Sequence, residues 1–130
     1  MIVKFLDMED EKNPLSGTLV DNSRTLLDIL ESAKKRMPFF CELVGETGTI
    51  LIGVGEPGCV QNTSSDGEPP YLMAVSPAGE YREGDFEFLA GGTATPVSPR
   101  YCLPFDLIKR IAVEFQQSGS RSSAVEWEEI

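Results

Sequence analysis

Carboxylates are the residues of this sequence that could do chemistry, and they are concentrated in its middle. The 130-residue chain contains no histidine, the side chain that most often serves as general base, nucleophile activator or metal ligand near neutral pH. Residues 37–99 contain nine carboxylates and one cation, Arg82. This composition favours a protein that presents negative charge to a partner over one that catalyses a reaction.

Two neighbouring carboxylates can act as general acid and general base, as they do in glycoside hydrolases. Asp85 and Glu87 alternate with Phe86 and Phe88, so both carboxylates are expected on the solvent side of a strand, where nothing tunes their pKa. A solvated sheet face is therefore the favoured interpretation. The spacing around Asp66 does not match a calcium-binding EF-hand loop, and a chain without histidine cannot form the usual serine or cysteine triad.

The segment Gly53-Val54-Gly55-Glu56-Pro57-Gly58 matches the GxGxxG pattern of dinucleotide-binding loops. Such a loop must open a helix whose N-terminus faces the pyrophosphate. Pro57 and the polar stretch 59–67 do not suit that helix, and Glu56 would repel phosphate. The pattern therefore predicts a glycine-rich turn between two strands, and the sequence as a whole predicts no nucleotide, metal or other cofactor.

The bulk properties predict a cytoplasmic protein with a basic partner. The net charge of −10 disfavours binding to nucleic acid or to an anionic membrane. No apolar run reaches the roughly 20 residues of a membrane-spanning helix, and the N-terminus does not have the form of a signal peptide. Three cysteines at wide spacing are typical of reduced core thiols: Cys41, Cys59 and Cys102.

Two segments have the apolar spacing of helices. The first follows Asp21-Asn22-Ser23 and runs through Leu26 to Met37, with three cations near its end and Pro38 after it. The second begins at Pro104, ends at Ser118-Gly119, and carries an apolar stripe formed by Leu107, Ile108, Ile111 and Phe115.

The remaining apolar segments are short and predict strands. Gly45-Glu46-Thr47-Gly48 joins two of them as a hairpin, and Ile50-Leu51-Ile52 is apolar on both faces, which indicates a covered central strand. The element order predicts one α+β domain, residues 1–130, in which two helices pack on one face of an antiparallel sheet. The expected strands are Ile2–Leu6, Phe39–Val44, Thr49–Val54, Cys59–Asn62, Tyr71–Val75, Asp85–Leu89, Ala94–Val97 and Val125–Trp127.

Two aromatic residues bear on where a partner could bind. Tyr71 follows Pro69-Pro70 and is either an exposed interface anchor or a strand residue with a buried ring. Trp127 alternates with Glu126 and Glu128, so its indole is expected to face the core.

Taken together, roughly residues 39–130 and the capped first helix resemble the Imm-one family of bacterial immunity proteins from polymorphic toxin systems. The most specific element is the closing Trp127-Glu128 after a helix and a polar linker. The other elements that carry the resemblance are the glycine-punctuated strand ending at Gly55, the strand at Tyr71, Phe88 with Gly91-Gly92, Arg100-Tyr101 before Pro104, and the helix through Phe115.

The resemblance implies an antidote that binds a secreted toxin, often a nucleic-acid deaminase, and blocks its active site without catalysis. A toxin that acts on nucleic acid needs a basic cleft, which an acidic surface could occupy. We therefore expect one-to-one binding to a basic toxin domain. Charge and loop position single out these partner-binding residues: Glu56, Asp66, Glu68, Tyr71, Glu80, Glu83 and Asp85. An acidic adaptor or nucleic-acid mimic without a dedicated toxin, and a small carboxylate enzyme, are the alternatives.

Overall fold

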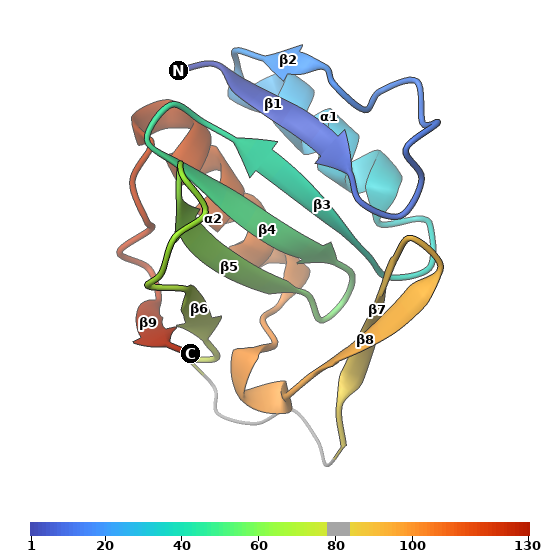
Figure 1. Cartoon of the computed structure of the whole chain (residues 1–130), viewed down its shortest axis with the longest axis vertical. Helices are drawn as coiled ribbons and strands as arrows, with labels where there is room; N and C mark the ends of the chain where they lie inside the picture. Colours follow the sequence, from blue (N-terminus) through green and yellow to red (C-terminus); the bar gives the residue numbers. More distant parts are fainter. Residues whose placement is uncertain (78–83) are drawn as a thin grey trace.

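An antiparallel β-sheet with two helices packed on one of its faces forms the fold (Figure 1). The computed structural model describes residues 1–77 and 84–130, so Glu80 and Glu83 lie outside the described residues. The strands are β1 (Val3–Asp7), β2 (Leu19–Val20), β3 (Phe39–Val44), β4 (Gly48–Val54), β5 (Cys59–Ser64), β6 (Leu72–Val75), β7 (Phe86–Ala90), β8 (Thr93–Val97) and β9 (Glu126–Glu129). The predicted α+β class is confirmed.

Helix α1 (Ser23–Ala33) begins where the Asp21-Asn22-Ser23 cluster predicts. The Asn22 side chain accepts a hydrogen bond from the Thr25 backbone N–H at 2.8 Å, which satisfies one of the free donors at the helix start. The prediction that the helix continues toward Met37 is wrong, because α1 ends at Ala33 and the Met37 side chain is 73% exposed. Pro38 disfavours helical geometry at the residue before it, and the three cations instead form a turn that leads into β3.

Helix α2 (Phe105–Ser118) has the boundaries that the sequence predicts. Pro104 precedes the first turn, and Gly119 ends the helix in the left-handed conformation (φ 73°), which glycine adopts without steric cost. Leu107 is only half-buried, whereas the other stripe residues lie in the core. A short 3₁₀ helix, η1 (Pro99–Tyr101), links β8 to this helix.

The strand order in the sheet is β2-β1-β3-β4-β5-β6-β9. The predicted hairpin is confirmed, with Cys41 opposite Ile52 in the β3–β4 register. The GxGxxG segment forms the turn between β4 and β5, as predicted, and no helix follows it. The β7–β8 hairpin leaves this path and joins β3 through one parallel bridge between Phe39 and Leu89.

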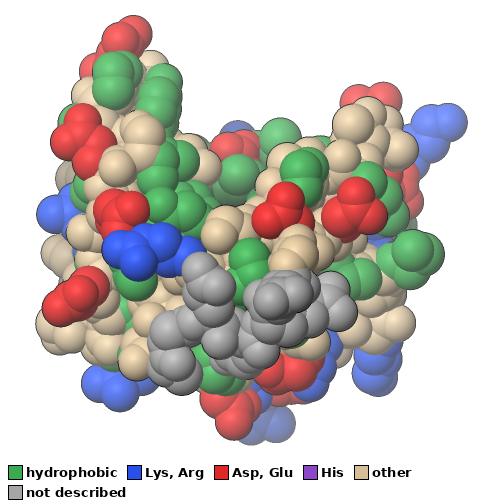
Figure 2. Space-filling model, turned by 90° about the horizontal axis from the view of Figure 1, so that it is seen from below, with side chains coloured by type: hydrophobic (Ala, Val, Ile, Leu, Met, Phe, Trp, Pro, Cys, Tyr) green, Lys and Arg blue, Asp and Glu red, His purple; other side chains and the backbone are tan. Residues whose placement is uncertain are grey.

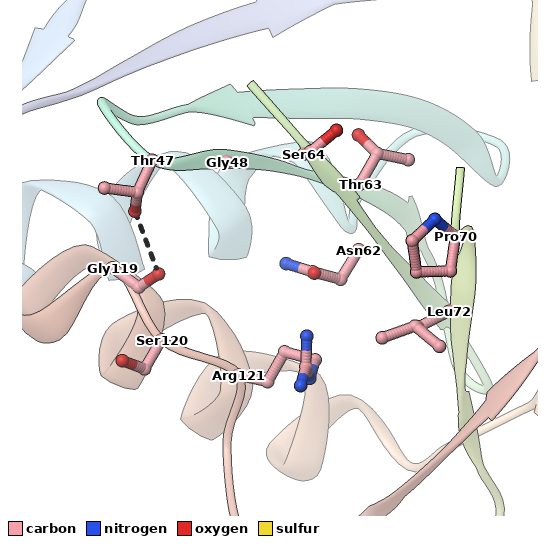
Figure 3. A pocket seen from close by; sticks show the side chains of 10 residues that line it. All are labelled: Thr47, Gly48, Asn62, Thr63, Ser64, Pro70, Leu72, Gly119, Ser120 and Arg121. Carbon is pink, nitrogen blue, oxygen red and sulfur yellow. Dashed lines mark hydrogen bonds between the residues drawn. The ribbon is translucent and has the colours of Figure 1, made fainter. Parts of the chain in front are cut away.

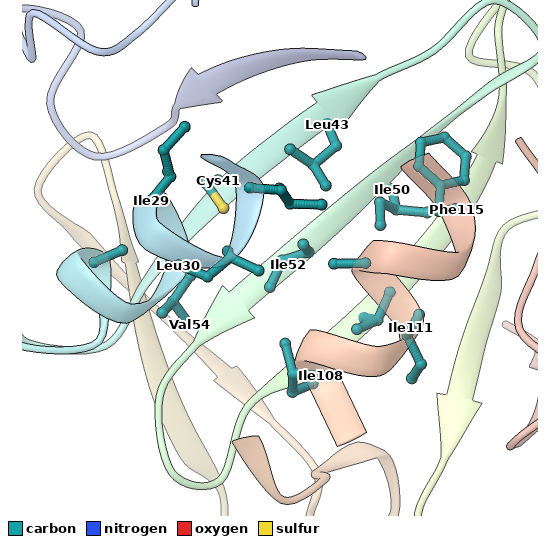
Figure 4. Close-up of a cluster of buried hydrophobic side chains, with 14 of the residues drawn as sticks. Ile29, Leu30, Cys41, Leu43, Ile50, Ile52, Val54, Ile108, Ile111 and Phe115 are labelled. Atoms are coloured by element: carbon teal, nitrogen blue, oxygen red, sulfur yellow. The ribbon is translucent and has the colours of Figure 1, made fainter. Parts of the chain in front are cut away.

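The main core lies between the sheet and the two helices (Figure 4). Alternate residues of β3 and β4 face Ile29 and Leu30 of α1 and Ile108, Ile111 and Phe115 of α2. Trp127 faces this core as predicted, but its ring is only half-buried, and its indole N–H donates to the Ser122 carbonyl at 2.9 Å. The three cysteines are buried, as expected for core thiols.

A second, smaller cluster lies on the opposite face of the sheet, where the β7–β8 hairpin covers it. Its buried members are Phe40, Cys59, Met73 and Phe88. The sheet is therefore covered by helices on one side and partly by a hairpin on the other. No helix among the described residues is both long enough and apolar enough to span a bilayer.

Candidate functional site

The β7–β8 hairpin and the helix-free face of the sheet enclose an apolar groove of about 630 Å³. Leu51 of β4 lies opposite Glu42 of β3 and opposite Gln61 of β5, and residues that are directly opposed in a sheet point to the same face. The side chains of these three residues therefore all lie on the face that has no helices. Met8 and Ile130 lie at the margins of the groove. Residues from the sheet, β8 and η1 that line the groove include Phe40, Leu51, Gln61, Met73, Pro96 and Tyr101.

Figure 2 views the molecule from the lower end of Figure 1 and shows this surface hollowed between two raised ridges. Hydrophobic side chains lie in the hollow, and carboxylates lie on both ridges. Left and right are the same in Figures 1 and 2, because the second view is the first turned about the horizontal axis. The ridge on the left of Figure 2 therefore lies on the β5–β6 side of the molecule, and the ridge on the right lies on the β7–β8 side.

The close approach of the hairpin to the sheet requires a glycine at position 53. A Cβ atom on Gly53 would lie 2.8 Å from Cδ1 of Phe88 and 2.6 Å from Sγ of Cys59. The Phe88 ring instead packs against Phe40 with 5.4 Å between ring centroids. The first glycine of the GxGxxG segment therefore allows the Phe88 ring to pack closely against the sheet, and it has no role in binding phosphate.

The tip of the hairpin is tied to the segment that follows β1. The Gly91 N–H donates to the Met8 carbonyl at 2.9 Å, and the Gly92 N–H donates to Oε1 of Glu9 at 2.6 Å. Both glycines have positive φ (57° and 83°), a conformation that few other residues adopt in a tight turn. These bonds hold the wall of the groove in place.

Asp7 organises the segment that carries Met8 and Glu9. Its buried carboxylate accepts hydrogen bonds from the backbone N–H groups of Glu9 and Asp10, the Asn13 amide and Nη1 of Arg36, the last at 2.7 Å. Burial alone would raise the pKa of this carboxyl, but the hydrogen bonds, first that from Arg36, outweigh it and lower the pKa. Asp7 is thus ionised and connects the turn after α1, through Arg36, to the segment that holds the wall of the groove.

Glu42 is a half-buried carboxylate on the same face of the sheet as the groove, next to the lining residue Leu51. It lies opposite Leu51 in β4 and opposite Leu6 in β1, with apolar side chains on both neighbouring strands. Burial raises its pKa, and within residues 1–77 and 84–130 no cation or hydrogen-bond donor pairs with it. Its charge is therefore partly desolvated and uncompensated.

Glu128 lies near the other end of the groove and is, in contrast, fully paired. Nε of Arg100 donates to Oε2 of Glu128 at 3.0 Å, and the Tyr101 hydroxyl donates to Oε1 at 2.8 Å. The hydrogen bonds from Arg100 and Tyr101 lower the pKa of Glu128. The network joins η1 to β9 and fixes the Tyr101 ring at the groove.

Three of the residues singled out from the sequence meet in the β5–β6 loop. The Tyr71 hydroxyl donates to the Gly67 carbonyl at 2.8 Å, and the Glu68 N–H donates to Oδ1 of Asp66 at 3.0 Å. A hydrogen bond from the Ser64 hydroxyl, together with that N–H, lowers the pKa of Asp66. Tyr71 precedes β6 and is half-buried, between the two alternatives considered for it.

The other sequence-derived candidates lie elsewhere. Glu56 is at the β4–β5 turn, and Oε2 of its carboxylate accepts the Phe105 N–H at 3.0 Å, so it caps the start of α2. The length of β5 puts that turn roughly 17 Å from the Asp66 loop, at about 3.4 Å per residue. Asp85 is exposed just before β7, and Glu80 and Glu83 are outside the described residues.

A second hollow, about 370 Å³, lies between the end of α2 and the strands β4 to β6 (Figure 3). The side chains of Asn62 and Arg121 point into it, and Thr47 donates to the Gly119 carbonyl at 3.4 Å. The C-terminal carbonyls of α2 lie beside this hollow, and their negative dipole end disfavours a bound anion. Within the described part of the chain, no cluster of three or more potential ligands could hold a metal ion.

Comparison with known families gives one match. The model of a family described as "Immunity protein Imm1" matches residues 12–129, nearly the whole chain. The chain belongs to the Imm1 family of immunity proteins. No curated protein matches it. The resemblance drawn from the sequence, including its closing Trp127-Glu128, is confirmed at the level of the family.

The groove of this immunity protein was not predicted from the sequence, although one signal for it was present. Leu51 is the residue that makes β4 apolar on both faces, and it lines the groove, whereas its neighbours Ile50 and Ile52 face the helices. A strand that is apolar on both sides needs a cover on both sides. The sequence did not show that the β7–β8 hairpin supplies only part of that cover.

Proposed function

We propose that this immunity protein is a single binding domain, residues 1–130, that neutralises a cognate secreted toxin by occupying the toxin's active-site cleft. The proposed toxin acts on nucleic acid, with deamination as the expected chemistry, and binds one-to-one. The observation that carries the proposal is the concentration of carboxylates in residues 37–99 of an Imm1 protein, nine against a single cation. A nucleic-acid-modifying enzyme has a basic cleft, because it must bind phosphates.

The distribution of ion pairs supports the proposal that the protein presents negative charge to its partner. Cations of α2 are paired with carboxylates of the helices: Lys109 lies 2.7 Å from Glu31, and Arg110 lies 3.7 Å from Glu114. The helix side of the molecule is therefore close to balanced. The excess negative charge is left to the strands and loops of the other side, where Glu42, Asp66, Glu68 and Asp85 have no cationic partner among the described residues.

The proposed mechanism needs no chemistry by the immunity protein. Opposite charges draw the two proteins together, and the bound surface excludes nucleic acid from the cleft. Association should exceed the uncharged range of about 10⁵–10⁶ M⁻¹s⁻¹ at low salt and slow steeply as salt is added. The ridge carboxylates would then govern association, and apolar contacts would govern dissociation.

The test is to co-express this chain with the protein encoded beside it and to assay the purified partner on nucleic acid. Co-purification as a one-to-one complex and loss of the partner's activity would support the proposal. Comparable binding to several unrelated basic proteins would indicate an acidic adaptor instead. Turnover of a small substrate that is lost in Glu or Asp variants would indicate a carboxylate enzyme.

A further inference from the structure

We propose that the apolar groove beside the β7–β8 hairpin is the docking site for the toxin, and that it receives a protruding toxin segment with an apolar side chain close to a Lys or Arg. The apolar side chain would enter the groove, and the cation would pair with Glu42. This inference rests on the proposed function and adds to it the face that binds and the chemistry of the segment that is bound.

The first observation is the state of Glu42. Its carboxylate is half-buried between Leu6 and Leu51 and has no partner among the described residues, which is an unfavourable arrangement for the isolated protein. Among the described strand residues, the other charged side chains on this sheet face are Lys4 of β1 and Glu126 and Glu128 of β9. Lys4 lies opposite Val44 and forms no ion pair with Glu42, and Glu128 is engaged by Arg100. A cation supplied by a binding partner would neutralise the charge of the Glu42 carboxylate and offset the cost of its burial.

The second observation is the position of Glu42 relative to the groove. Glu42 and Leu51 are directly opposed across β3 and β4, which places their Cβ atoms about 4.5–5.5 Å apart. Leu51 lines the groove. An apolar side chain that packs on Leu51 and a cation that reaches Glu42 can therefore come from neighbouring residues of one segment.

The third observation is the character of the groove itself. Its volume of about 630 Å³ can hold several side chains, and its lining is mostly apolar. Carboxylates occupy the raised ridges on both sides (Figure 2). An apolar centre with a polar rim is the usual anatomy of a protein interface, and the predominance of carboxylates on this rim favours a basic partner.

The wall of the groove is already in place without the toxin. The hairpin tip is bonded to Met8 and Glu9, Leu89 N–H donates to the Pro38 carbonyl at 2.9 Å, and Phe88 is buried. Docking would therefore cost little ordering of the immunity protein itself, which favours tight binding.

Two matched pairs of variants test the proposal against the purified toxin encoded beside this chain. Gln61→Trp fills the groove from its floor, and Gln117→Trp places the same ring on the exposed side of α2. Glu42→Gln removes the unpaired charge with little change of shape, and Asp28→Asn removes an exposed charge from α1. Circular dichroism and thermal melting establish that each variant is folded before binding is measured.

We expect Gln61→Trp and Glu42→Gln each to weaken toxin binding by at least about tenfold, chiefly through faster dissociation, while both control variants bind like the wild type. Glu42→Gln should also melt at or above the wild-type temperature, because it removes a desolvated charge from the free protein. A residue that merely stabilised the fold would lower the melting temperature when replaced.

Wild-type affinity in both Gln61→Trp and Glu42→Gln would overturn this inference, even if the wild-type protein inhibits the toxin. Failure of the wild-type protein to bind the toxin at all would instead overturn the proposed function. A dimer of the wild-type protein that Gln61→Trp dissociates, with unchanged toxin affinity, would assign the groove to a second copy of the chain and would also overturn the inference.

Discussion

Replacing Asp7 with Asn should destabilise the protein by roughly 2–4 kcal/mol. The substitution keeps Oδ1, which accepts the N–H groups of Glu9 and Asp10, but it puts an NH₂ group where Oδ2 accepts from Asn13 and Arg36. Each hydrogen bond to a charged group contributes about 1.5–3 kcal/mol. The sum for the two lost bonds must be reduced, because the Arg36 side chain is 37% exposed and water can solvate its charge after the change.

Urea unfolding followed by circular dichroism measures this change, with Asp10→Asn as the control in the same loop. Asp10 is exposed, and within the described part of the chain its carboxylate accepts one hydrogen bond, from the Lys12 N–H to Oδ1 at 3.0 Å, so its replacement should cost much less. Equal free energies of unfolding for Asp7→Asn and the wild type would refute the central position of Asp7 in this segment.

The pH dependence provides a second check on Asp7. Its pKa in the folded protein is below the ordinary value of 3.8, so the unfolded chain takes up the proton first as the pH falls. The stabilisation is therefore complete above pH 3.8 and is lost as the pH falls through the folded-state pKa. The difference in stability between wild type and Asp7→Asn should be constant near neutral pH and should shrink below about pH 4. A difference that grows on acidification would contradict this sign.

Three further predictions concern residues outside the groove. Trp127→Ala should lower the free energy of unfolding in urea by about 2–3 kcal/mol, less than the roughly 3–5 kcal/mol expected for a fully buried ring. The control Met37→Ala, at an exposed side chain, should change it very little. Equal effects of the two substitutions would show that Trp127 does not pack on the core. Glu56→Gln should cost about 1 kcal/mol through the weakened cap of α2 and leave toxin affinity unchanged, so a loss of affinity at wild-type stability would return Glu56 to the interface. Burial raises the pKa of Cys41 and Cys59, so neither thiol should react with iodoacetamide in the folded protein; rapid labelling before unfolding would contradict their burial.

Features encoded within a short stretch of sequence were predicted well. Asn22 and Gly119 mark helix ends because capping depends on neighbouring residues, and the β3–β4 hairpin follows from its turn and its alternating pattern. The end of α1 was misplaced because apolar spacing reaches Met37, while the contact of Arg36 with Asp7, 29 residues away, favours a turn there.

The candidate site was predicted only in part, because it depends on long-range packing. Asp66, Glu68 and Tyr71 are neighbours in sequence and meet in one loop, whereas the capping of α2 by Glu56 spans 49 residues and has no local signal. The groove depends on contacts between residues far apart in the sequence, namely the bridge between Phe39 and Leu89 and the bonds of the hairpin tip to Met8 and Glu9. Pattern alone places Phe88 on a buried face but does not identify the strand it covers.

The most direct test is to titrate the toxin encoded beside this chain with the immunity protein and to follow the toxin's activity on nucleic acid. We predict that activity falls linearly and disappears at one equivalent, with association that slows as salt is raised. Undiminished activity at a saturating excess of the folded immunity protein would contradict the proposal that it neutralises this toxin by occupying its active-site cleft.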